Sequence, residues 1–167
     1  MPTQQQDYIL RHIETISRLI ARLRRKGKPL EPEDTAEVND ALLLTLQLQE
    51  KNFGMPAAQF LALPADEQVA ALKRAETKTA GHERCLTYAT LLKHTAELYA
   101  FRGSSDLALG ARLLALHVAV AVALDQPIDV ATVRALVREL LVVLDGADLP
   151  PPTRALLDQF SAGAACV

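Results

Sequence analysis

Residues 113–124 form the longest apolar run in this chain, and they constrain its fold more than any other feature. The run is LLALHVAVAVAL, with Arg112 before it and Asp125 after it. A helix that spans a bilayer needs about 20 apolar residues, more than lie between these two charges. We therefore predict that this segment is buried by the rest of the chain and that no transmembrane segment is present.

The Val-Ala alternation at 118–123 also resembles a β-strand. A single strand with no other strand to pair with would leave its backbone N–H and C=O groups without partners, so we predict a helix. Elsewhere, apolar residues recur at helical spacing between breaks made by glycine and proline. The predicted helices span 4–26, 34–51, 57–62, 64–77, 81–102, 106–124, 129–145 and 152–160.

The widest apolar faces belong to helices 81–102 and 106–124, which places these two at the centre of the fold. The connections are short, so sequential helices are expected to be antiparallel neighbours. We predict a single all-α domain over residues 1–160, a bundle of about seven helices built from antiparallel hairpins, with a flexible tail at 161–167.

The two central helices resemble a tetratricopeptide hairpin. In that pattern a large residue, a small residue and a tyrosine precede a turn glycine, and two alanines follow where the helices cross. The corresponding residues here are Leu92, Ala96, Tyr99, Gly103, Ala108 and Ala115. The sequence departs from the pattern at Arg112, where a large aromatic residue is usual, and no second copy of the hairpin is found.

The chain also resembles a bacterial family of unknown function. Members of that family open with a string like D-Y-I-L-R-x-I-E, here residues 7–14, and carry a later string like C-L-x-x-A-x-L-L-K, here residues 85–93. The resemblance covers roughly residues 5–125. It implies an all-helical, tetratricopeptide-like fold. No activity, cofactor or catalytic residue is carried over from the family to this chain.

Charge is unevenly distributed along the chain. Residues 1–28 carry seven basic and two acidic side chains, whereas residues 29–83 carry four basic and ten acidic ones. The two segments are expected to neutralise each other within the fold. The alternative is that the basic string Arg22–Lys28 contacts nucleic-acid phosphates, which the low aromatic content and the acidic whole chain disfavour.

The first helix carries the candidate partner-binding residues. Four isoleucines form a narrow stripe along it, and three arginines lie off that stripe: Ile9, Ile13, Ile16, Ile20, Arg18, Arg22 and Arg25. Such a stripe either pairs with a copy of itself, which would give a homodimer, or closes one end of the bundle. The sequence leaves both interpretations open.

Residues with the potential for chemistry are few. His82 and Cys85, like His94 and Glu97, have a spacing that suits a metal, but the two pairs lie too far apart along one helix to share an ion. His117 is expected to be a buried neutral imidazole with one hydrogen-bonded nitrogen. As a catalytic base it would need a carboxylate partner that the sequence does not identify.

Phosphate loops and nucleophile elbows are absent from the sequence. We therefore expect no enzymatic activity, no cofactor and no metal. Two cysteines, Cys85 and Cys166, are too few for a disulfide framework and suit a reducing cytoplasm. The function predicted from the sequence is a cytoplasmic helical protein–protein interaction module that binds an unidentified protein or peptide.

Overall fold

The all-α prediction is confirmed by the computed structural model, which describes residues 4–125 and 129–164. Within these residues the chain forms helices and no strand. The helices are α1 (Gln4–Lys26), α2 (Pro32–Phe53), α3 (Ala57–Leu61), α4 (Ala65–Lys73), α5 (Lys78–Phe101), α6 (Ser105–Leu124), α7 (Val130–Val143) and α8 (Pro151–Ala164). A flexible tail was predicted at 161–167, but residues 161–164 form the last turn of α8. The rest of that tail, including Cys166, lies outside the described residues.

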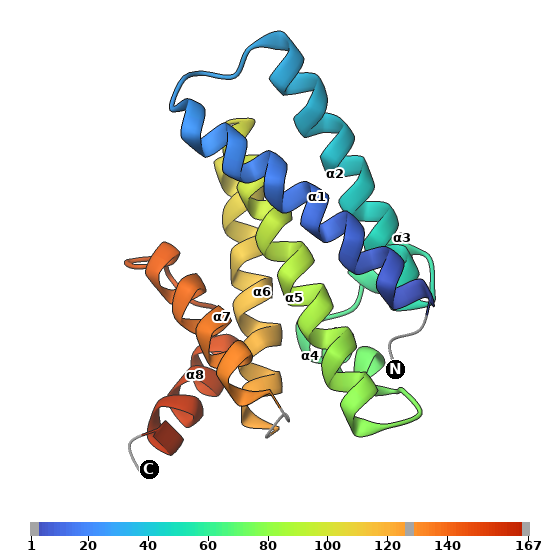
Figure 1. Ribbon diagram of the computed structural model, residues 1–167. Coiled ribbons are helices and arrows are strands. Elements are labelled where there is room, and N and C mark those ends of the chain that lie inside the picture. Colours follow the sequence, from blue (N-terminus) through green and yellow to red (C-terminus); the bar gives the residue numbers. More distant parts are fainter. Residues whose placement is uncertain (1–3, 126–128, 165–167) are drawn as a thin grey trace.

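Helix α5 lies at the centre of the fold. Figure 1 shows α1 and α2 on one side of α5, and α6 followed by α7 and α8 on the other. One apolar core joins α1 and α2 to Leu91 and Leu98 of α5. A second core joins α3, α4, α6 and α7 to other residues of α5, including Cys85 and Tyr88.

The antiparallel hairpin expected at the centre is present as α5 and α6. Gly103 makes the turn between them with φ of +76°, a left-handed conformation that glycine adopts without steric cost. Ala96, Ala108 and Ala115 are buried where the two helices pack together. Small side chains at these positions allow the two backbones to approach closely.

The burial predicted for the apolar run is confirmed at its middle. Residues 115–120 are all buried, and α6 packs against α4, α5, α7 and α8. By length and hydropathy alone, α6 could cross a membrane, and 44% of its apolar window is buried inside the protein. The expectation that α6 is covered on every side is wrong for its first half, where Leu107 is 56% exposed.

Hydrogen bonds between buried polar side chains connect α4 to α5. The Tyr88 hydroxyl donates a hydrogen bond to Gln68 Oε1 (2.8 Å), and Gln68 Nε2 donates to the Leu63 carbonyl (2.9 Å). The Tyr88 ring also meets the stacked rings of Phe53 and Phe60 edge-on. Hydrogen bonds of this kind remove most of the cost of burying polar groups.

Candidate functional site

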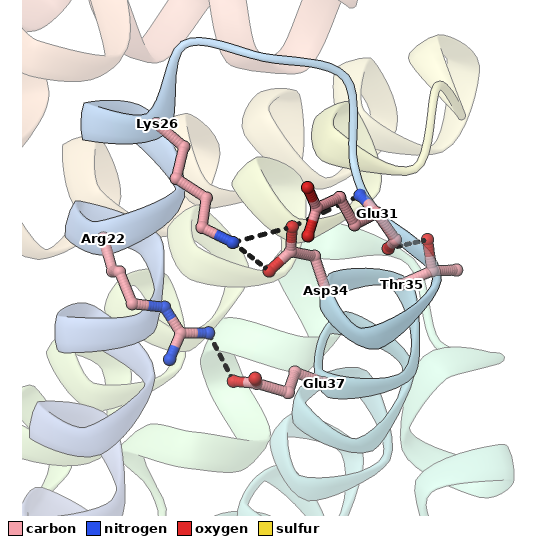
Figure 2. Close-up of polar contacts among 6 residues, drawn as sticks. All are labelled: Arg22, Lys26, Glu31, Asp34, Thr35 and Glu37. Carbon is pink, nitrogen blue, oxygen red and sulfur yellow. Dashed lines mark hydrogen bonds and ion pairs between the residues drawn. The ribbon is translucent and has the colours of Figure 1, made fainter.

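The basic end of α1 faces the acidic beginning of α2. Lys26 Nζ lies 2.8 Å and 3.0 Å from the two carboxylate oxygens of Asp34, and Arg22 pairs with Glu37 (Figure 2). Asp34 is buried and also accepts a hydrogen bond from the Glu31 N–H (3.2 Å) in the first turn of α2. Hydrogen bonding to Lys26 lowers the pKa of Asp34, and the same contact raises the pKa of Lys26.

A third basic residue of this string reaches α5, where Arg24 Nη2 lies 2.7 Å from Glu97 Oε1. The pairs made by Lys26 and Arg22 join the basic first segment to the acidic second one, as the charge pattern predicted, whereas Glu97 lies outside that acidic segment. In the described part of the chain only Arg25 and Lys28 of the string have neither an ion pair nor a hydrogen bond. That arrangement disfavours the nucleic-acid alternative, because two unpaired basic side chains contribute little affinity for phosphates.

The isoleucine stripe of α1 faces inward. Ile9, Ile16 and Ile20 are buried against α2 and α5, and Ile13 is half-buried at the edge of the same core. Because α2 and α5 cover the stripe, the structure favours the interpretation that it closes one end of the bundle. Of the flanking arginines, Arg18 pairs with Glu14 on the exposed side of α1.

His117 lies within a chain of hydrogen bonds that joins three helices. Its Nδ1 lies 2.9 Å from the Thr153 hydroxyl in the first turn of α8, and its Nε2 lies 2.8 Å from Asp66 Oδ1 in the first turn of α4. Both ring nitrogens therefore have partners, whereas the sequence predicted only one. The carboxylate that could not be identified from the sequence is Asp66.

Asp66, His117 and Thr153 occur in the order of a nucleophilic triad, but their exposure is the reverse of what catalysis requires. Thr153 and His117 are 3% and 2% exposed, whereas the Asp66 side chain is 73% exposed. A nucleophilic hydroxyl has to reach its substrate, and this one is enclosed. We therefore interpret the chain of hydrogen bonds as a structural connection between α4, α6 and α8.

The residues with metal-ligand spacing on α5 are not brought together. His82 Nε2 lies 2.7 Å from Asp125 Oδ2, which also pairs with Lys73 Nζ at 3.2 Å. Burial raises the pKa of the Cys85 thiol to about 11, which disfavours the thiolate that a metal needs. His94 lies in another part of the helix, and the described residues contain no group of three side chains placed to hold a metal ion.

A largely apolar recess lies between α2 and α6, with α5 as its floor. We call it the leucine groove; its volume is about 630 Å³. Its floor is one helical stripe of α5, Leu92, Thr95 and Tyr99, continued by Arg102 directly after the end of that helix. The walls and one end come from α2, α3 and α6: Asn39, Leu42, Leu43, Thr45, Leu46, Gln49, Leu61 and Ala111.

Exposed leucines surround this groove. Leu43, Leu46 and Leu61 line it, and Leu107 lies one helical turn before Ala111 on the same face of α6. The exposed fractions of these four side chains are 61%, 41%, 44% and 56%. Single exposed apolar side chains are ordinary, whereas a group of them around one recess is typical of an interaction surface.

Three polar groups in the leucine groove are free to bind a partner. Thr95 and Gln49 bond to each other or to backbone, but the Asn39 amide, the Tyr99 hydroxyl and the Arg102 guanidinium have no partner within the described residues. Among the described residues that line the groove, Arg102 is the one that carries a charge. The groove is therefore apolar with one cationic end, which complements an apolar ridge that carries a carboxylate.

A second recess of about 540 Å³ lies between α1, α5, α6 and α7. Ion pairs within the protein, Arg24–Glu97 and Lys93–Glu139, occupy much of its lining. Its charged groups already have partners, apart from Arg112, so it presents less free binding capacity than the leucine groove.

Sequence reasoning missed the leucine groove, although α2 contains a signal for it. The string Leu42-Leu43-Leu44-Thr45-Leu46 places leucines on all sides of the helix. A helix that packs on one side only cannot bury all of them. The surplus leucines, Leu43 and Leu46, are the ones that are exposed beside the groove.

Comparisons with protein-family models, with curated proteins and with solved structures found no significant match.

Proposed function

We propose that this protein is a non-enzymatic protein–protein interaction module, and that its binding site is the leucine groove. The observation that carries the proposal is the group of exposed leucines around a recess whose floor ends at the unpaired Arg102. An amphipathic helix fits such a groove, because its apolar residues enter the recess and its polar side stays in water. As part of the same proposal, the protein works in the cytoplasm without a cofactor.

The energetics favour an apolar ligand with an acidic residue. Covering a leucine that is half exposed contributes about 1 kcal/mol, so the four leucines together offset a substantial part of the entropic cost of association. Pairing a carboxylate with Arg102 adds specificity for the orientation of the bound helix. Without an acidic residue near that end, a ligand helix would lose this orientation.

Binding of a synthetic amphipathic peptide tests the proposal. The probe is a fluorescent helical peptide of leucine, glutamate and lysine with all leucines on one face, and its anisotropy is followed as protein is added. We expect saturable binding that Leu43→Glu weakens by about tenfold or more, since a charge then enters the apolar wall.

Two controls separate binding in the groove from non-specific hydrophobic binding. Leu10→Glu introduces the same change at a leucine of α1 that is 50% exposed and far along the sequence from the groove, and it should leave binding unchanged. A peptide of identical composition with scrambled order should not bind. Equal weakening by both leucine variants, or equal binding of both peptides, would refute the leucine groove as the site.

A further inference from the structure

Helix α2 presents the kind of ridge that the leucine groove accepts. Leu43 and Leu46 project from its exposed side, and Asp40 lies one turn before Leu43. Asp40 is exposed and has neither an ion pair nor a hydrogen bond within the described residues. One surface of this chain therefore contains an apolar recess with a free cation next to an apolar ridge with a free carboxylate.

The two free charges lie toward the same end of the groove. Helices α2 and α5 run antiparallel (Figure 1), and a hydrogen bond between Gln49 and Thr95 sets their alignment. From that bond, Asp40 is about 14 Å further along α2 and Arg102 about 10 Å further along α5 in the same direction, at 1.5 Å per residue. A two-fold axis parallel to the groove would bring α2 of one copy against α6 of the other. Such a rotation leaves the position of each charge along the axis unchanged.

We infer that the occupant of the leucine groove is a second copy of this chain, bound through a two-fold interface in which Leu43 and Leu46 of each copy enter the groove of the other. Asp40 of each copy then pairs with the partner's Arg102. This inference rests on the proposed function and names the partner. An isologous interface needs one patch that is complementary to itself, and adjacent ridge and groove with opposite free charges satisfy that requirement.

Sedimentation velocity at increasing protein concentration, combined with charge reversal, tests the inference. The wild-type protein should shift from monomer to dimer as concentration rises. Asp40→Arg and Arg102→Asp should each weaken dimerisation about tenfold, because each creates two like-charge contacts per dimer. The double variant should restore it, because the charges have exchanged sides. Circular dichroism and thermal unfolding verify that all variants are folded.

Leu43→Glu and Leu10→Glu provide the matched pair of apolar variants. The first should abolish the dimer, and the second should leave it intact. A wild-type protein that is monomeric at every concentration overturns the second copy as occupant, whereas binding of the synthetic peptide by that monomer would leave the proposed function standing. A dimer that survives Leu43→Glu, or a double charge variant no better than the single ones, also overturns the inference.

Discussion

Replacing His94 should reveal how much a buried, unsatisfied imidazole costs this fold in acid. His94 lies on α5 with 7% of its surface exposed, and its Nδ1 has no hydrogen-bond partner within the described residues. Burial lowers the pKa of His94 from 6.5 to about 4, and the charges of Lys93 and Arg24 act in the same direction, opposed by Glu139.

The sign of the pH effect follows from the direction of that shift. The unfolded chain binds a proton at His94 near pH 6.5, whereas the folded protein resists it until about pH 4. The contribution of His94 to the free energy of unfolding is therefore fully present above pH 6.5 and is lost as the pH is lowered toward 4. A difference of about 2.5 pKa units corresponds to about 3 kcal/mol in total, of which about 2 kcal/mol is lost by pH 5.

Urea unfolding of the wild-type protein and of His94→Leu measures this contribution. Between about pH 8 and pH 5, the wild-type protein should lose about 2 kcal/mol more stability than the variant. Asp34 and Asp125 have lowered pKa values and stay ionised in the folded protein over this interval, so they do not obscure the difference. At the higher pH, the variant should be at least as stable as the wild type, because leucine removes an unsatisfied buried nitrogen. Equal losses in the two proteins would refute the reasoning.

Three further substitutions test the packing. Tyr88→Phe leaves the buried carbonyl of Gln68 without its donor and should lower the free energy of unfolding in urea by about 1–3 kcal/mol. Thr153→Val breaks the bond to His117; it should increase amide hydrogen exchange in α8 relative to α5, and equal exchange would contradict the connecting role of this bond. Gly103→Ala places a side chain at a positive φ and should lower the melting temperature, with a cost of about 1 kcal/mol.

The sequence was sufficient to predict that the fold is all-α and which two helices lie at its centre. Apolar spacing along residues 81–102 and 106–124 predicted the central hairpin. The charge asymmetry predicted that the first two segments neutralise each other, and the ion pairs of Lys26 and Arg22 with α2 agree with that prediction, although the sequence did not identify these pairs. These features are local or depend on neighbouring segments, which periodicity and charge counting capture.

Features that depend on which helix covers which face could not be obtained in this way. Periodicity shows that the stripe containing Ile16 is apolar. It does not show whether α2 and α5 or a second copy of the chain packs against that stripe. The partners of His117 come from residues 51 positions earlier and 36 positions later in the chain, a separation that spacing rules do not reach. Exposure of Leu107 was missed because α6 is apolar on all sides and its pattern does not mark the face left open.

The most direct test of the central claim, that the leucine groove is the interaction surface, is methyl NMR of selectively labelled leucines. Spectra are compared at low and high protein concentration, and with and without the amphipathic peptide. Our account predicts that the methyl signals of Leu43, Leu46, Leu61 and Leu107 move while that of Leu10 stays in place. Signals that move at Leu10 and not around the groove, or no movement under either condition, would contradict it.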